Sequence, residues 1–168
     1  FSGRATDTPA TESADTILNG SGARAGLKQI IAERRAADLG TAGLGRLAVT
    51  APTTSSVAIT QDASPFGLKL ASVTSTLTGA TVSGPTGAPP AVTVDFAAQP
   101  ANGEKIKFAV TLPDGSSESF ELTASDAVPT PSGSFAIGAT PDATAANLVA
   151  AVTTSIGKIA NTSLIAAS

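Results

Sequence analysis

Oxygen-bearing side chains alternate in one stretch of the sequence, at Asp114, Ser116 and Glu118. Because Ca²⁺ is held by carboxylate and carbonyl-type oxygens at alternating positions, this stretch is loosely like part of a calcium loop. The same residues, with Gly115 among them, also suit a hairpin turn, in which Asp and Gly are favoured for their backbone conformations. The turn is the stronger interpretation, so no metal site is predicted here.

Three glycines, Gly40, Gly43 and Gly45, lie in the run GTAGLG and superficially suggest a phosphate-binding loop. A true phosphate loop follows a strand and opens a helix, because the loop amides and the helix N-terminus together hold the phosphate. Here the glycines follow a predicted helix and precede a predicted strand. The order of the elements therefore argues against nucleotide binding.

Side chains for catalysis are scarce in this sequence. There is no His and no Cys, which excludes imidazole bases, thiolate nucleophiles, disulfides and the usual zinc, haem and iron–sulfur ligands. A Ser–Lys nucleophile pair would need a Ser placed by a recognisable motif, and none accompanies Lys69, Lys105, Lys107 or Lys158. We expect that the protein is not an enzyme, with no catalytic, cofactor-binding or metal-binding residues and no cofactor.

A charged cluster, made of Glu33, Arg34, Arg35 and Asp38, lies on a predicted helix. Such a cluster could dock a partner. It could equally be a solvated helix face, on which charges three and four residues apart support the helix. The sequence leaves these two interpretations open.

Small residues dominate the composition. Ala, Thr, Ser and Gly make up a little more than half of the 168 residues, and charged residues only 14%, against about 25% in typical domains. The net charge of −3 argues against nucleic acid as a partner, because its recognition needs a basic face. Phe is the only aromatic residue, which also disfavours glycan binding, and no apolar run suggests a membrane span. This composition is typical of an extracellular bacterial surface or filament protein.

The periodicity of the apolar residues predicts an α+β fold, made mainly of antiparallel β-sheet with two amphipathic helices. One helix is expected at about 23–39, where Leu27, Ile30 and Ile31 form an apolar stripe. The other is expected at about 141–156, with Thr140 as its N-cap. Strands are expected in the ranges 47–50, 56–60, 68–77, 80–83, 92–96, 105–112, 119–122 and 134–137.

The clearest of these elements is a hairpin. Apolar and polar residues alternate on both sides of a Pro-Asp-Gly turn at 113–115, which is typical of two half-buried antiparallel strands. This alternation places Lys105 and Lys107 on the same outer face as Glu121, so cross-strand ion pairs are expected there.

Three parts are expected along the chain: a lead-in or linker at 1–22, a single α+β domain at 23–157 and a return segment at 158–168. Both ends look like cut edges of a longer polypeptide. Charge is divided unevenly, with a net +1 over residues 1–46 and a net −4 over residues 47–168. An acidic β region therefore follows a mildly basic helical segment.

Several strings of this sequence are typical of one protein family. They are LKQIIAERRAADLG at 27–40 followed by GLGRL at 43–47, SPFGLKL at 64–70, and IGATPDATAANL at 137–148. Together these strings resemble the central variable region of certain long bacterial flagellins, over residues 15–168. The lack of Cys and Trp and the richness in Ala, Thr and Ser are also similar to that family.

The resemblance implies a structural function. It implies a surface-exposed outer domain of the bacterial flagellar filament, inserted between terminal segments that polymerise the filament and that this sequence lacks. The implied location is extracellular, and the implied partners are neighbouring flagellin subunits and host receptors or antibodies, with no nucleic acid and no membrane. This chain alone is expected to be monomeric, and the two ends of the domain are expected to lie close together.

An alternative function remains open at the level of the sequence. The chain could be a binding module of a secreted adhesin or a tail-fibre-like protein that recognises surface glycans or a host. The absence of Tyr, Trp and His disfavours this alternative, because those side chains usually line such binding pockets.

Overall fold

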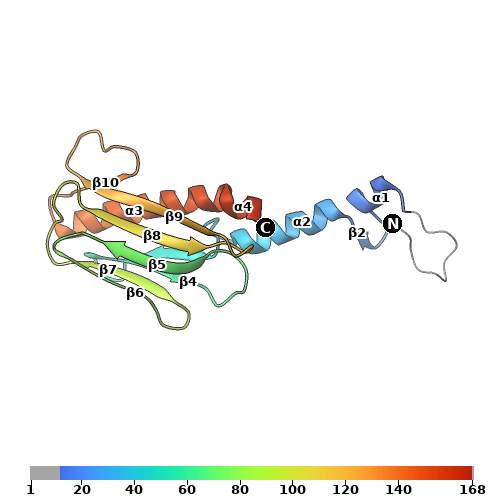
Figure 1. Cartoon of the computed structure of the whole chain (residues 1–168), viewed down its shortest axis with the longest axis horizontal. Coiled ribbons are helices and arrows are strands. Elements are labelled where there is room, and N and C mark those ends of the chain that lie inside the picture. Colours follow the sequence, from blue (N-terminus) through green and yellow to red (C-terminus); the bar gives the residue numbers. More distant parts are fainter. Residues whose placement is uncertain (1–11, 168) are drawn as a thin grey trace. The chain divides into compact units, whose positions relative to one another are not determined.

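The structure is a computed structural model that describes residues 12–167. The chain divides into two compact units, Phe1–Ala37 and Asp38–Ser168, and each unit is described by itself. Helices occur together with mostly antiparallel sheets, so the predicted α+β class is confirmed (Figure 1).

The first unit contains a short helix, a small hairpin and most of a longer helix. These elements are α1 (Ala14–Asn19), β1 (Gly20–Ser21), β2 (Arg24–Ala25) and α2 (Leu27–Leu39), whose last two residues belong to the second unit. The helix predicted at about 23–39 begins at Leu27 instead, because the backbone of Arg24 and Ala25 pairs with β1.

The apolar stripe predicted on the first helix is present but is not buried. Leu27, Ile30 and Ile31 are 46%, 52% and 39% exposed. Asp38 is the buried residue of α2. Sequence periodicity therefore identified the stripe correctly and could not say what, if anything, covers it.

The second unit contains two four-stranded sheets. One sheet has the strand order β3-β4-β7-β6 and is antiparallel throughout. The other has the order β10-β9-β8-β5 and is antiparallel except between β10 and β9. The strands are β3 (Leu47–Thr50), β4 (Ser56–Gln61), β5 (Lys69–Ser75), β6 (Ala80–Thr86), β7 (Ala91–Phe96), β8 (Lys105–Thr111), β9 (Ser117–Ser125) and β10 (Ser134–Ala136). Each of the eight ranges predicted from the sequence overlaps one of these strands, although β4, β6, β7 and β9 extend beyond the predicted bounds.

The long helix α3 (Pro141–Asn161) begins where the sequence predicts. The hydroxyl of Thr140 accepts a hydrogen bond from the backbone N–H of Ala143 at 3.1 Å, which satisfies one of the free donors at the helix start. Asp142 in the first turn places a negative charge beside the positive end of the helix dipole.

The end of α3 differs from the prediction. The helix expected at about 141–156 continues through Gly157 to Asn161, and α4 (Ser163–Ala167) follows directly. Ile159 is 8% exposed and Ala160 is fully buried. The burial of these residues outweighs the cost of a Gly inside a helix, which is about 1 kcal/mol. The return segment expected at 158–168, for which no secondary structure was predicted, is therefore largely helical in its described part.

The hydrophobic core of the second unit lies between the two sheets and α3. The helix contacts β9 and β10 of one sheet and β3, β4 and β7 of the other, while β5 and β6 lie beside each other away from it (Figure 1). Along α3 the fully buried positions recur every three to four residues, as expected for one helix face. They are Thr144, Ala145, Leu148, Val152, Ile156 and Ala160.

By length and composition alone, the segment Pro141–Ala167 could cross a membrane, with a mean hydropathy of 1.3. This corrects the expectation that no segment is apolar enough. In the fold, however, Leu148, Val152 and Ile156 are fully buried and belong to the core cluster that also contains residues of both sheets. Thr154 and Lys158 are among its exposed side chains, so one face of the helix is apolar and buried and another is exposed.

The predicted hairpin is formed by β8 and β9. Lys107 lies directly opposite Glu121, and Lys105, one step along the same face, makes the ion pair with Glu121 at 2.8 Å. On the inner face, Phe108 stacks on Phe120 with ring centroids 5.1 Å apart. The alternation therefore placed the apolar residues of this hairpin on the inner face and Lys105, Lys107 and Glu121 on the outer face, as the structure has them.

Replacing Leu148 with Ala tests the role of α3 in the core. Leu148 is fully buried, so truncation leaves a cavity between the helix and the sheets. We expect the free energy of unfolding in urea to fall by about 2–5 kcal/mol. The matched control is Thr154→Ala on the exposed side of the same helix, which should change it by less than about 0.5 kcal/mol. Equal effects of the two variants would mean that α3 is not a core helix.

Candidate functional site at the base of the second unit

The first and last parts of the second unit meet at one buried leucine. Leu68 is fully buried, and its N–H donates to the carbonyl of Gly45 at 2.9 Å. A Cβ on Gly45 would lie 2.8 Å from Leu68 and 2.9 Å from Leu164 of α4. The loop that enters the unit, the loop before β5 and the terminal helix therefore share one contact.

Gly67, in the loop before β5, brings the end of α2 into this contact as a fourth segment. A Cβ on Gly67 would lie 2.6 Å from the carbonyl oxygen of Gly45 and 2.8 Å from that of Asp38, and its φ is +77°. Only a glycine fits this approach without moving the backbone. Asp38 is fully buried and accepts the Gly67 N–H on Oδ1 at 2.8 Å.

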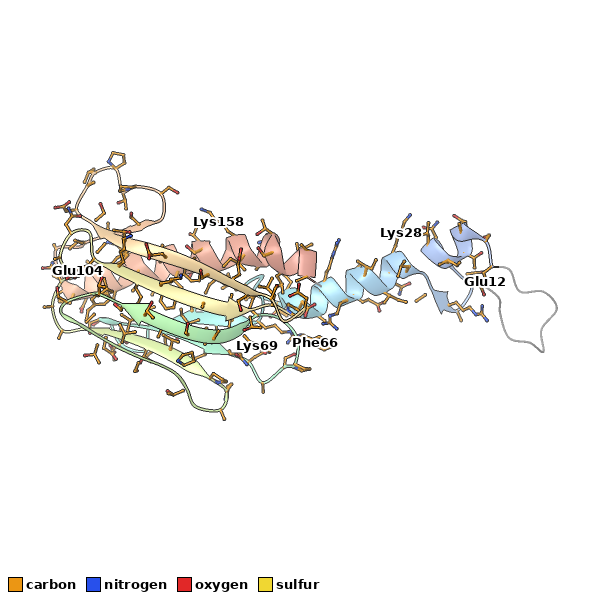
Figure 2. All side chains as sticks on the ribbon, in the orientation of Figure 1. Glu12, Lys28, Phe66, Lys69, Glu104 and Lys158 are labelled. Carbon is orange, nitrogen blue, oxygen red and sulfur yellow. The ribbon has the colours of Figure 1, made fainter. Side chains whose placement is uncertain are left out.

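Charged side chains surround the same loop. The guanidinium of Arg46 pairs with Asp62 at 2.9 Å and lies over the ring of Phe66, 6.0 Å from its centroid. The ammonium of Lys69 donates to the carbonyls of Ser64 and Phe66, and the second of these bonds is 2.9 Å long. Figure 2 shows Phe66 and Lys69 close together at one end of the unit.

We call this group the junction cluster: Asp38, Gly45, Arg46, Asp62, residues 66–69 and Leu164. Its polar groups bind one another and the backbone of the loop before β5, so their role is structural. Lys69 is occupied by two carbonyl oxygens, and Asp62 Oδ1 accepts the N–H of Ser64 at 3.0 Å. The cluster therefore can fix how the chain enters and leaves the unit, and it presents no poised acid, base or nucleophile.

The glycine run GTAGLG lies inside the entry loop, between α2 and β3. This order of elements is the reverse of that in a phosphate loop. Gly45 is required there because of its contacts with Leu68 and Leu164. Gly45 thus has a packing explanation, whereas a Cβ on Gly43 would have no neighbour within 4 Å, and glycine is favoured there by the positive φ of 70°.

The alternating oxygens at 114–118 are not brought together. Asp114 Oδ1 accepts hydrogen bonds from the N–H and the hydroxyl of Ser116, at 2.9 and 2.6 Å, and these bonds lower the pKa of Asp114. Glu118 instead accepts a hydrogen bond from Ser163 at 3.2 Å. Among residues 12–167, no three acidic side chains are grouped closely enough to hold a metal ion. This geometry agrees with the hairpin turn.

The charged residues of the predicted helical cluster differ in their surroundings. Asp38 is buried in the junction cluster, whereas Glu33 accepts a hydrogen bond from Gln29 at 2.8 Å on the exposed part of α2. The choice between a docking face and a solvated face therefore concerns residues 33–35 only.

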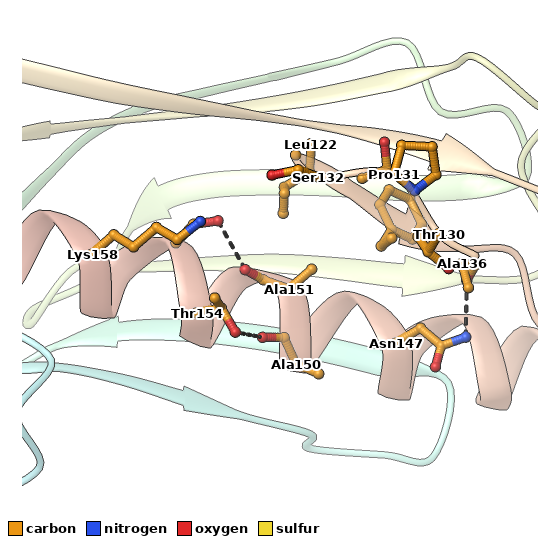
Figure 3. Close-up of a pocket in the computed structure, with 14 residues that line it drawn as sticks. Leu122, Thr130, Pro131, Ser132, Ala136, Asn147, Ala150, Ala151, Thr154 and Lys158 are labelled. Atoms are coloured by element: carbon orange, nitrogen blue, oxygen red, sulfur yellow. Dashed lines mark hydrogen bonds between the residues drawn. The ribbon is translucent and has the colours of Figure 1, made fainter. Parts of the chain in front are cut away.

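A groove of about 380 Å³, lined by both polar and apolar residues, lies between α3, β10 and the loop before it (Figure 3). Lys158 lines one end, but the neighbouring hydroxyls of Thr154 and Ser155 donate to the carbonyls of Ala150 and Ala151, both at 2.9 Å. These hydroxyls are committed to the helix backbone, so no Ser–Lys pair is formed here.

A further acidic residue, which sequence reasoning missed, lies at the opposite end of the unit (Figure 2). Glu104 Oε2 accepts hydrogen bonds from the N–H of Thr78 (2.7 Å), its hydroxyl (3.0 Å) and the N–H of Ala101 (2.9 Å). The Thr78 backbone N–H is the main cause of the lowered pKa of Glu104. One carboxylate thus ties together two loops, and no local pattern in the sequence indicates it.

Comparison with protein-family models, curated proteins and solved structures finds no match to this chain. The functional interpretation therefore depends on the residues and on the geometry of the two units.

Replacing Asp38 with Ala tests the junction cluster. The variant leaves the Gly67 N–H buried without its acceptor, so we expect the free energy of unfolding to fall by about 1–3 kcal/mol. Asp126→Ala, at an exposed position, is the control for loss of one negative charge and should be nearly neutral. Urea unfolding followed by circular dichroism measures both. A neutral Asp38→Ala variant would show that the buried carboxylate does not hold the loop.

Glu104 predicts a dependence of stability on pH. Its pKa in the folded protein lies below the ordinary value of 4.5. The carboxylate therefore stabilises the fold above about pH 4.5, and this contribution is lost as the pH falls through the lower, folded pKa. We expect Glu104→Gln to melt at a lower temperature than the original protein at about pH 7 and the difference to shrink at about pH 3. A melting-temperature difference that is equal at both pH values would contradict this role.

Proposed function

We propose that this chain is an outer, surface-exposed domain of a bacterial flagellin, a structural component of the flagellar filament. The observation that carries the proposal is the contact of Gly45, Leu68 and Leu164, which puts the entry and the exit of the second unit at one end. A domain inserted into a longer polypeptide needs this arrangement, because both of its ends must rejoin the same neighbouring domain.

The state of the polar groups supports the same proposal. Among the described residues, every buried polar side-chain atom has a hydrogen-bond partner. The two carboxylates with a lowered pKa, Glu104 and Asp114, are held by hydrogen bonds within the fold. A filament coat needs cohesion and inertness toward its surroundings rather than a reactive site. The choice of the flagellin family rests on the resemblance of the sequence strings quoted above.

The second candidate is a binding module of an adhesin or tail-fibre-like protein. The groove beside α3 favours it, since polar side chains are among those that line it: Thr130, Ser132, Asn147 and Lys158. A carbohydrate site, however, usually includes an aromatic platform, and Phe135, the aromatic residue at this groove, is 1% exposed. We therefore place it second.

Antibodies against the purified chain test the proposal. Immunogold electron microscopy of the source bacterium should label flagellar filaments along their whole length. Sheared and washed filaments should contain this sequence by peptide mass spectrometry. Label on the cell body or on other fibres, with clean filaments, would contradict the proposal. Binding of the chain to defined glycans on an array, abolished by Lys158→Glu, would favour the second candidate.

The proposal also predicts the behaviour of the isolated chain. Because the polymerising segments implied by the family are not part of this sequence, the 168-residue chain should not form filaments. Light scattering after gel filtration should give the mass of a monomer, 16.3 kDa, and electron microscopy should show no fibres. Filaments formed by this chain alone would contradict the assignment of polymerisation to other segments.

A further inference from the structure

Strand β10 is the outer strand of its sheet and runs parallel to its neighbour β9. In a parallel ladder, alternate residues of a strand direct their N–H and C=O groups toward the same neighbour. On this strand they are the odd-numbered residues: the carbonyl of Gly133 accepts an N–H of β9 at 3.1 Å, and the N–H of Ile137 donates to a carbonyl of β9 at 2.9 Å. The backbone groups of Ser134 and Ala136 therefore point away from β9.

Two backbone groups on this outer edge have no hydrogen-bond partner among residues 12–167. The N–H of Ser134 donates to the carbonyl of Pro131 at 3.2 Å, and the carbonyl of Ala136 accepts from Asn147 Nδ2 at 2.9 Å. The carbonyl of Ser134 and the N–H of Ala136 are left over. An acceptor and a donor at this spacing can both pair with one added strand, because a strand edge is a template for another chain.

The groove of about 380 Å³ beside α3 lies along this edge. Asn147 reaches from α3 to the carbonyl of Ala136, so the outer edge of β10 faces the helix (Figure 3). On the side of the helix the groove is lined by Ala150 and Ala151, whose small side chains leave room for an occupant. In recognition by strand addition, an extended peptide pairs with such an edge through its main chain, and side-chain contacts give selectivity.

The charge of the groove indicates what the peptide carries. Among the described residues that line the groove, Lys158 is the charged one, and its ammonium has no ion-pair partner within residues 12–167. The acidic residues of the surrounding segments do not line the groove; they are Glu118, Glu121, Asp126 and Asp142. Charge complementarity therefore favours an acidic group on the occupant, at the end of the groove where Lys158 lies.

The helix sets the length of the peptide. Figure 3 shows Asn147 and Lys158 at opposite ends of the stretch of α3 that lines the groove. They are about three helical turns apart, which is about 16 Å along the helix axis. An extended chain advances about 3.3 Å per residue, so about five or six residues reach from one end to the other.

We infer that the groove between β10 and α3 binds an extended peptide segment that adds to β10 as a strand and carries an acidic residue beside Lys158. The inference rests on the two free backbone groups, the groove and the lysine, and it does not depend on the proposed function. A peptide is favoured over a glycan because the free groups have the spacing of a strand edge and no exposed aromatic ring lines the groove.

Three capped peptides of about six residues test this inference on the full 168-residue chain. The first has alternating Val and Thr in the middle and Glu at both ends, so that the direction of the added strand does not matter. The second has Lys at both ends. The third is the Glu peptide with its central N–H groups methylated. Fluorescence anisotropy should show that the Glu peptide binds at least about fivefold more tightly than the Lys peptide. It should bind at least about tenfold more tightly than the methylated peptide, which cannot pair with the edge.

Hydrogen exchange of the Ala136 N–H reports directly on strand addition. In the free protein this N–H should exchange faster than the N–H of Ile137, which is bonded to the carbonyl of Ser125. Saturating Glu peptide should slow the exchange at Ala136 by at least about tenfold and leave that at Ile137 within about twofold. Nuclear magnetic resonance of the isotope-labelled chain measures both.

A first pair of variants tests the charge. Lys158→Glu reverses the charge at the end of the groove at an exposed position, and binding of the Glu peptide should weaken by at least about fivefold. Lys107→Glu makes the same change on the outer face of the β8–β9 hairpin and does not touch the groove, so binding should stay within about twofold of the original.

A second pair of variants tests the groove itself. Ala150→Phe fills the groove from an exposed position of α3, and binding of the Glu peptide should weaken by at least about tenfold. Ala146→Phe adds the same ring at an exposed position of α3 that does not line the groove, and binding should be kept. Circular dichroism confirms that all four variants are folded.

Any of four results would overturn the inference. The first is the absence of binding by the Glu peptide at about 1 mM. The second is equal binding of the three peptides, or equal binding by the two members of either pair of variants. The third is binding that leaves the exchange at Ala136 unchanged. The fourth is a defined glycan, or a dimer of the chain itself, whose binding Ala150→Phe abolishes while the Glu peptide does not compete, because this would assign the groove to another occupant.

Discussion

The contact of Leu68 with Gly45 and Leu164 is the constraint on which the second unit depends. It joins the loop that follows α2, the loop that leads into β5 and the last helix, so the chain enters and leaves at one place. Asp38 and Arg46 hold the same loop by a buried hydrogen bond and an ion pair. A unit closed in this way can be carried as a side domain without separating the parts of the chain on either side of it.

Much of the fold follows from patterns that the sequence shows directly. Alternation of apolar residues placed β8 and β9, and the sequence Thr140-Pro141-Asp142 placed the start of α3, because both signals are local. The end of α3 was missed because burial of Ile159 and Ala160 overrides the local preference of Gly157. Tertiary packing, which local patterns do not contain, decided that boundary.

The candidate site was less accessible to sequence reasoning for the same reason. Asp38 and Gly67 are 29 positions apart in the sequence, and Gly45 and Leu164 come from opposite ends of the unit. No local sequence pattern links the two members of either pair. The string that contains Phe66, Gly67 and Lys69 was singled out only by its resemblance to a family. In the structure this string forms the loop before β5 and the start of that strand, and its residues 66–69 belong to the junction cluster. Their role is to hold the entry loop, the end of α2 and α4 together.

The central claim is that the second unit has both of its chain ends at one pole, and a distance between those ends tests it most directly. The chain has no Cys, so Thr41→Cys with Ala166→Cys allows two spin labels to be placed without background. From the contact of Gly45 with Leu164, the labelled backbone positions should be less than about 25 Å apart by electron paramagnetic resonance. Because α3 alone spans about 31 Å over its 21 residues, a distance above about 35 Å would place the ends at opposite poles and contradict the account.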